Sequence, residues 1–129
     1  MENKINSVTD DKLKTFFPLL AIPIGCFRDT GRRAIPTMEG RSRLLKGNYR
    51  RRKFAIQKCG VAAERRGYRV FAIQHQGWCA SSRFAYRTYG RYGRSKRCRN
   101  GKGGPWANTV YVLKGNKNFS FGLSQPTSF

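Results

Sequence analysis

Residues 48–74 read NYRRRKFAIQKCGVAAERRGYRVFAIQ, and the first part of this stretch has the periodicity of a helix. Ala55, Cys59 and Ala62 follow one another at spacings of four and three, so a helix would place them on one face. We therefore expect a main helix over about residues 49–66, with this apolar stripe turned toward a core.

Both ends of this helix are marked in the sequence. Asn48 is a residue type that commonly caps a helix start, and Gly67 stands where a helix often ends in the left-handed conformation. Residues 68–74 then predict a strand, because they are rich in β-branched and aromatic side chains. The strand is almost continuously apolar, which indicates that both of its faces are covered.

Further elements are indicated on either side of this stretch. Residues 22–28 and 109–113 predict strands, and the chain is expected to turn at residues 77–79. Ser81 or Ser82 can cap a second, shorter helix that continues to about residue 92. A loop rich in Gly, Arg and Lys separates this helix from the closing strand.

The chain of 129 residues has the length of one ordinary domain. We expect an extended arm over residues 1–21, a basic domain over residues 22–115 and a second arm over residues 116–129. The formal net charge is +21, and +20 of it lies in residues 25–115, where 23 Lys and Arg residues face three acidic ones.

This charge balance points to a polyanionic partner. Such a domain repels itself, and a basic face is the electrostatic footprint of a protein that binds nucleic acid, acidic glycan, an anionic surface or acidic subunits. A solvated, merely soluble surface is the alternative, although about 2–8 net charges suffice for solubility. The aromatic content of 13% is too high for a disordered basic tail, and no apolar run approaches the ~18 residues of a spanning helix.

Two groups of cations are candidates for the ligand-binding surface. Four cations crowd the predicted first turn of the main helix, where they oppose the helix dipole, and this placement suggests that they serve an anion. Residues 86–94 alternate tyrosines with arginines, and tyrosine rings stack on sugars or bases while arginine forks bind carboxylate, sulfate or phosphate. With one tryptophan and one loop lysine, the candidate ligand-binding residues are Arg50, Arg51, Arg52, Lys53, Trp78, Tyr86, Arg87, Arg91, Tyr92, Arg94 and Lys102.

Aromatic side chains also have a purely structural interpretation. Tyr89 fits a core position of the shorter helix. Trp78 and Trp106 are expected to pack in the core, with a platform for a sugar as the alternative.

The four cysteines, Cys26, Cys59, Cys79 and Cys98, are widely spaced and form no CxxC pair, which argues against zinc. An even count in a small basic domain favours two disulfides, and four free buried thiols are the alternative. Four cysteines allow three connectivities, and their spacing does not choose between them.

Nothing in the sequence indicates an enzyme, a metal site or a cofactor. Cys79 and His75 lie four residues apart, but no acidic residue stands nearby to orient the imidazole, so a structural cysteine is favoured. The three acids of the basic domain have no spacing typical of an acid–base pair and are expected to pair with arginines. Residues 101–104 (GKGG) lack the Gly-Lys-Ser/Thr ending of a nucleotide-binding loop.

Several stretches resemble a known module. They are residues 25–29 (GCFRD), 33–40 (RAIPTMEG), 70–74 (VFAIQ), 77–82 (GWCASS) and 100–108 (NGKGGPWAN). Together they resemble a small cysteine-containing module of secreted, lectin-like proteins of marine invertebrates, which is broadly similar to WSC and PAN/apple domains. The resemblance covers about residues 24–114.

The resemblance implies an α+β fold, with the main helix and the shorter one packed on a small twisted antiparallel sheet and stapled by two disulfides. By analogy with PAN/apple domains it also implies the pairings Cys59–Cys79 and Cys26–Cys98. Binding of a glycan or a protein is the usual role of such modules.

We expect a non-catalytic binding module that recognises a polyanion, most readily an acidic glycan, through a basic aromatic face. The alternative is a structural assembly protein, such as a minor capsid, cement or matrix component, whose basic domain bridges acidic subunits or nucleic acid and whose arms dock on neighbours. A protein that binds only nucleic acid is a third possibility. The expected location is extracellular or particle-associated, without a transmembrane segment; residues 16–25 are interrupted by prolines and do not read as a cleaved signal.

Overall fold

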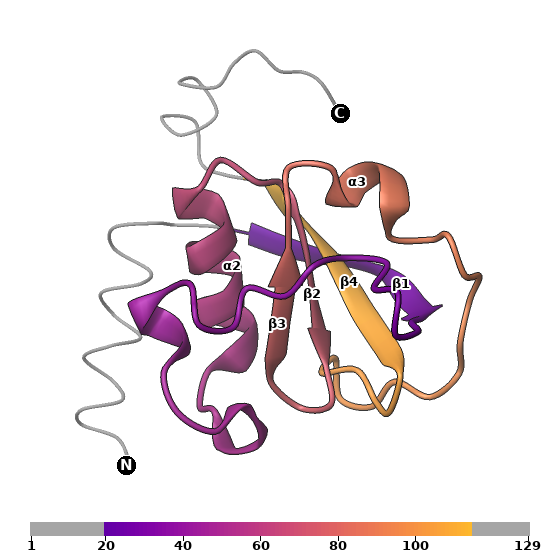
Figure 1. Ribbon diagram of the computed structural model, residues 1–129, viewed down its shortest axis with the longest axis horizontal. Helices are drawn as coiled ribbons and strands as arrows, with labels where there is room; N and C mark the ends of the chain where they lie inside the picture. Colours follow the sequence, from indigo (N-terminus) through magenta and orange to yellow (C-terminus); the bar gives the residue numbers. More distant parts are fainter. Residues whose placement is uncertain (1–19, 115–129) are drawn as a thin grey trace.

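A four-stranded antiparallel sheet forms the centre of the computed structural model, which describes residues 20–114 (Figure 1). The two predicted arms fall outside this range, apart from Leu20 and Ala21. The strands are β1 (Leu20–Arg28), β2 (Val70–Gln74), β3 (Trp78–Ser81) and β4 (Ala107–Lys114), in the spatial order β1-β4-β2-β3.

Helices and short 3-10 turns complete the α+β domain, which confirms the predicted fold class. The main helix is α2 (Ala55–Arg65), and α3 (Ala85–Thr88) is a single turn. Two 3-10 turns, η1 (Arg43–Leu45) and η2 (Tyr49–Arg51), precede α2.

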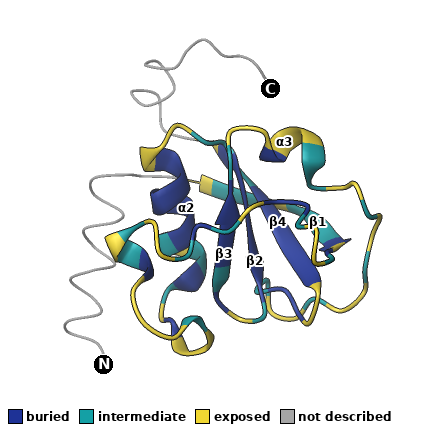
Figure 2. Ribbon diagram, viewed as in Figure 1, coloured by how far each residue is buried: buried dark blue, intermediate teal, exposed yellow. Residues whose placement is uncertain are grey.

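Strand β2 is buried along its whole length (Figure 2), and its alternation assigns its side chains to two separate cores on the two faces of the sheet. Phe71 and Ile73 pack with α2 on one face. Val70 and Ala72 pack on the other face with α3 and the segment 29–36. Since all five residues of β2 are buried, the prediction of a strand covered on both faces is confirmed.

The main helix begins later than predicted. Phe54 adopts a left-handed conformation at φ 54°, which ends the preceding turn and forces α2 to start at Ala55 instead of residue 49. Asn48 does act as a cap, but its side chain accepts the Arg50 N–H (2.9 Å) at the start of η2. The cations of residues 50–53 therefore lie ahead of α2 and not in its first turn.

The end of α2 follows the prediction. Gly67 has φ 80°, and its N–H donates to the Glu64 carbonyl (2.9 Å) while the Tyr68 N–H donates to the Ala63 carbonyl (3.0 Å). These two bonds form a Schellman motif, which satisfies carbonyls that the helix leaves unpaired.

Strands β1, β2 and β4 each begin two residues from their predicted starts, and the turn before β3 and the end of the shorter helix also differ from the predictions. Trp78 and Cys79 belong to a strand, because the turn is made earlier by His75 and Gln76, both at positive φ. The shorter helix ends at Thr88 instead of residue 92. Its continuation turns back so that residues 93–95 hydrogen-bond to the outer edge of β1.

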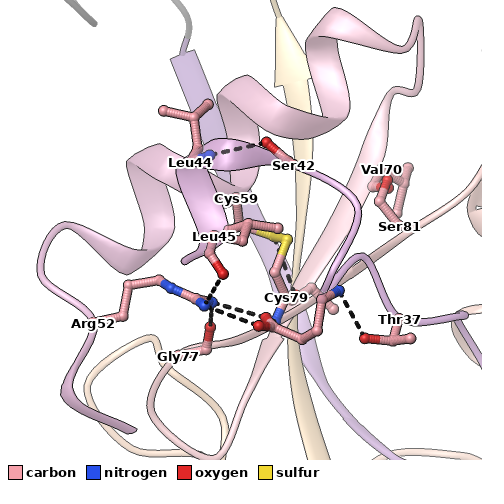
Figure 3. The surroundings of a disulfide bond; sticks show 12 residues. Thr37, Ser42, Leu44, Leu45, Arg52, Cys59, Val70, Gly77, Cys79 and Ser81 are labelled. Carbon is pink, nitrogen blue, oxygen red and sulfur yellow. Dashed lines mark hydrogen bonds and ion pairs between the residues drawn. A yellow bond between two sulfur atoms is a disulfide. The ribbon is translucent and has the colours of Figure 1, made fainter. Parts of the chain in front are cut away.

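Both disulfides have the pairing that the resemblance implied. Cys59–Cys79 joins α2 to β3 (Figure 3), and Cys26–Cys98 ties the long loop before β4 to β1. The first closes a loop of 20 residues and the second a loop of 72 residues. The loop before β4 carries much of the site described next. Cys26–Cys98 therefore fixes the position of that part of the site.

Candidate ligand-binding site

The three acidic side chains of the described region are all turned into the protein. Asp29 and Glu64 are buried, and Glu39 is half-buried. Residues 20–114 contain 23 Lys and Arg residues, so the exposed charge of this region is positive apart from Glu39, which has 21% of its side chain exposed. The pKa of Lys58 is lowered by partial burial and by the neighbouring charges of Arg52 and Lys53, as expected where cations are crowded.

Arg52 forms a structural ion pair with Glu39. Its Nη1 and Nη2 reach the two carboxylate oxygens at 2.7 and 2.8 Å, and they also donate to the carbonyls of Gly77 (2.7 Å) and Leu45 (2.8 Å) (Figure 3). The Oε2 atom of Glu39 also accepts the Cys79 N–H, at 2.8 Å. Because only 1% of the Arg52 side chain is exposed, this guanidinium is committed to the fold, and we leave Arg52 out of the ligand site.

Asp29 organises the opposite face of the sheet. Its Oδ1 accepts the Ala34 N–H at 2.8 Å, and its Oδ2 accepts from Arg33 Nη1 and from Gln74 Nε2, both at 2.9 Å. Gln74 Nε2 also donates to Asn108 Oδ1 at 2.9 Å. Strands β2 and β4 thereby fix the carboxylate that in turn fixes Arg33.

Arg33 lies between two tryptophans. Its guanidinium carbon is 4.3 Å from the ring centroid of Trp78 and 4.9 Å from that of Trp106, within the range of cation–π contacts. One third of the Arg33 side chain (34%) stays exposed. This stack presents aromatic faces and a positive charge together at the surface.

Trp106 is held in a strained turn. Gly104 and Ala107 exchange two backbone hydrogen bonds (3.0 and 3.1 Å), and Pro105 precedes Trp106 at φ 53°, the arrangement of a type II turn. Glycine or asparagine normally occupies that position, because a bulky side chain is strained at positive φ. Trp106 nevertheless remains 49% exposed, which contradicts the expectation that it packs in the core.

Two cavities flank Trp106. One, of about 220 Å³, is lined by aromatic and polar side chains that include Arg33, Tyr49, His75 and Trp78. The other, of about 260 Å³, is lined by Arg28, Asp29, Ser95 and Arg97. Trp106 therefore borders both an aromatic cavity and a basic one.

Of the predicted ligand-binding residues, Trp78 alone lines either of these two cavities. Arg50 lies beside the aromatic cavity, with its guanidinium 6.0 Å from the ring centroid of Tyr49, and Arg51 and Lys53 are exposed nearby. Trp78 and Tyr86 were both predicted to bind the ligand, but the cavity beside Trp78 does not include Tyr86. These two residues lie on β3 and on α3.

The predicted cations and tyrosines of residues 86–94 form a separate surface around α3. Arg87 stacks on Phe84 (4.9 Å) and near Tyr86 (5.8 Å), Arg91 lies 5.9 Å from the Tyr92 ring, and Arg94 lies over Phe27 (5.1 Å). A side-chain hydrogen bond with Thr30 lowers the pKa of Tyr92. Tyr89 packs edge-on against Phe27, as its predicted core role requires. Lys102 is half-buried in the loop, and its carbonyl accepts the Gln76 N–H.

Sequence reasoning did not find Asp29, Arg33 or Trp106 as one site. Asp29 and Arg33 lie four residues apart, yet they are far from Trp106 in the chain, so only the fold brings them together. The one local signal was Pro105-Trp106, which places a bulky residue directly after proline in a turn.

No group of His, Cys, Asp and Glu within residues 20–114 is arranged to hold a metal ion. The helices of this region include none long and apolar enough to cross a membrane. The chain matches no protein-family model, no curated protein and no solved structure. The resemblance to WSC and PAN/apple domains therefore stays a prediction.

Proposed function

We propose that this chain is a non-catalytic binding module for an acidic glycan, and that the stack of Trp78, Arg33 and Trp106 is its binding surface. The observation that carries this proposal is Trp106: a large aromatic residue kept half-exposed, in a backbone conformation that disfavours it. Backbone strain of this kind persists where the surrounding structure enforces it, and it is concentrated at functional sites.

The chemistry of the stack suits an acidic sugar. An exposed indole offers an apolar face to the C–H groups of a sugar ring, and a guanidinium offers directed donors to an anionic substituent. Asp29 holds Arg33 in place before any ligand arrives, which lowers the ordering cost of binding.

The charge distribution supports a polyanionic ligand. Since the acids of residues 20–114 are turned inward, an approaching polyanion meets cations and neutral groups, and association is accelerated at low salt. The two disulfides are typical of an oxidising compartment, so we place the module outside the cell or on a particle.

Trp106→Gly tests this role. Glycine relieves strain of about 1–3 kcal/mol at positive φ, whereas an exposed cation–π contact contributes only about 0.5–1 kcal/mol. We expect a free energy of unfolding that is unchanged or higher, together with at least a tenfold loss of affinity for heparin in calorimetric titrations.

Phe84→Ala is the matched control, because Phe84 is equally exposed (48%) and also stacks on an arginine. We expect it to retain affinity for heparin within about twofold, a difference well below 1 kcal/mol. Equal losses in both variants would contradict the assignment of the surface to Trp106.

A salt series with heparin, duplex DNA and a neutral glycan separates the classes of ligand. We expect heparin to bind with a clear salt dependence and in preference to DNA of equal charge. Equal or tighter binding to DNA would replace the proposal with a nucleic-acid binder, salt-insensitive binding to the neutral glycan would remove the polyanion, and no binding at all would favour the assembly role.

A further inference from the structure

The basic cavity behind Trp106 carries an inference about which acidic glycan binds. It has a volume of about 260 Å³ and is lined by Arg28 from β1, by Ser95 and Arg97 from the loop before β4, and by Trp106. This volume is close to the lower end of ordinary ligand pockets, ~300 Å³, so the cavity fits one substituent or one sugar unit.

The donors in this cavity are not used by other side chains of residues 20–114. Neither Arg28 nor Arg97 forms an ion pair or a side-chain hydrogen bond within residues 20–114. Ser95 Oγ accepts the Arg97 N–H at 3.1 Å, which leaves its hydroxyl hydrogen to be donated. Asp29 also lines the cavity, but its two oxygens already accept three hydrogen bonds, from Arg33, Ala34 and Gln74.

The backbone around the cavity is fixed before binding. Ser95 N–H donates to the Cys26 carbonyl (3.0 Å), Arg28 N–H donates to the Gly93 carbonyl (2.9 Å), and Cys26–Cys98 closes the loop. At Gly104 a Cβ atom would lie 2.0 Å from the Arg97 carbonyl oxygen, so the turn of Trp106 and the segment of Arg97 are in direct contact.

We propose that this cavity is a subsite for a tetrahedral oxyanion carried by the sugar that stacks on Trp106, and that the ligand is a sulfated glycan. This inference rests on the function proposed above. A planar carboxylate is satisfied by the fork of one arginine, whereas an ester-linked sulfate or phosphate has three terminal oxygens. Two guanidinium groups and one hydroxyl, offered from two separate segments, match three oxygens better than two.

Trp106 connects the two parts of the ligand. Because Trp106 lines both cavities, a sugar stacked on it can extend a substituent into the cavity lined by Arg28 and Arg97. The aromatic cavity on the other side then receives the next unit of the glycan.

The experiment titrates the full chain with four sugars at 0.15 M salt: N-acetylglucosamine 6-sulfate, N-acetylglucosamine 6-phosphate, glucuronate and unmodified N-acetylglucosamine. The chain has two tryptophans, so the indole N–H signals of Trp78 and Trp106 can be followed by NMR and assigned with Trp106→Gly. Arg28→Gln and Arg97→Gln remove the subsite, and Arg99→Gln is the matched control from the same loop that lines neither cavity.

We expect the sulfated sugar to bind at least tenfold more tightly than the uronate or the neutral sugar, with a shift of the Trp106 signal. Arg28→Gln and Arg97→Gln each lower this affinity about tenfold, as loss of a charge-assisted hydrogen bond does, and Arg99→Gln lowers it less than about twofold. Tighter binding of the 6-phosphate than of the 6-sulfate would keep the tetrahedral subsite but overturn the assignment of a sulfated ligand in favour of a phosphorylated one.

Failure of this inference is distinguishable from failure of the proposed function. Equal losses in Arg97→Gln and Arg99→Gln, or equal affinity for uronate and sulfate, would overturn the subsite while the Trp106 signal still responds to acidic sugars. If no sugar shifts the Trp106 signal and heparin does not bind, the proposed function itself is wrong.

Discussion

Two arginine–carboxylate pairs lie on opposite faces of the sheet, and the same kind of ion pair has a different role in each. In Arg52–Glu39 the arginine is the hidden partner, with 1% of its side chain exposed, and every terminal nitrogen is used by the protein. In Arg33–Asp29 the acid is hidden, with 0% of its side chain exposed, and the arginine reaches the surface between two indoles. Where the arginine is the buried partner, its role is structural. Where the acid is the buried partner, the arginine remains available to a ligand.

The largest effect is expected from Arg52→Met. This change leaves Glu39 without its partner and removes donors from the Gly77 and Leu45 carbonyls, and breaking a buried pair in this way costs about 3–5 kcal/mol. Denaturant unfolding with the disulfides intact measures it, and Arg51→Met, an exposed neighbour, should stay within about 0.5 kcal/mol of wild type.

The same variants decide whether Arg52 belongs to the ligand site. We expect Arg52→Met to keep the affinity for heparin within the range of Arg51→Met at temperatures where both are folded. A specific loss of binding in Arg52→Met would return Arg52 to the list of ligand residues and weaken the contrast between the pairs.

A smaller effect on stability is expected from Arg33→Met, because Asp29 keeps its hydrogen bonds from Ala34 and Gln74. We expect a loss of about 2 kcal/mol, since one charged hydrogen bond contributes about 1.5–3 kcal/mol, together with a loss of glycan binding. Arg33→Lys retains the charge but not the planar stacking group, so it should recover part of the stability and little of the binding. Full binding in either variant would separate Arg33 from the site.

The smallest effect concerns Glu64, the third acid of residues 20–114. Glu64 is buried, its Oε1 accepts no hydrogen bond from residues 20–114, and burial raises its pKa, partly opposed by Arg65. The folded state therefore holds the proton more tightly than the unfolded chain, whose glutamate pKa is about 4.3. Stability contributed by this group is complete below that value and is lost as pH rises through the folded-state pKa.

Glu64→Gln removes this titration. We expect its melting temperature relative to wild type to rise with pH, from no advantage near pH 4 to a small advantage at pH 7. A difference that is flat over this range would show that Glu64 has no raised pKa in the folded protein.

Local signals in the sequence predicted the helix end, the buried strand β2 and the strands β1 and β4, because each depends on neighbours along the chain. Gly67 is an example, since only the helix that precedes it decides its conformation. The predicted start of the main helix was wrong because the left-handed conformation of Phe54 has no local signature in the sequence. Strand β3 was missed because the turn before it uses His75 and Gln76 in place of glycine or asparagine. The disulfide pairing came from resemblance and not from spacing.

The site was less predictable than the fold. Clusters of charge along the sequence drew attention to residues 50–53 and 86–94, whereas the stack that forms depends on three segments that meet only in space. Arg52 was wrongly predicted as a ligand residue for the same reason. Its neighbours in sequence are exposed cations, but its burial follows from Glu39, which is 13 residues away.

Three glycines next to the site have a consequence for any mutational scan of this protein. A Cβ atom at Gly77 would lie 2.0 Å from the Tyr49 carbonyl oxygen, one at Gly103 would lie 2.3 Å from that of Ile73, and Gly104 is equally crowded. Substitutions there would abolish heparin capture as thoroughly as changes at Trp106, by pushing segments apart. A map of intolerant positions alone would thus misassign these glycines as ligand contacts, although they have no side chain that could touch a sugar.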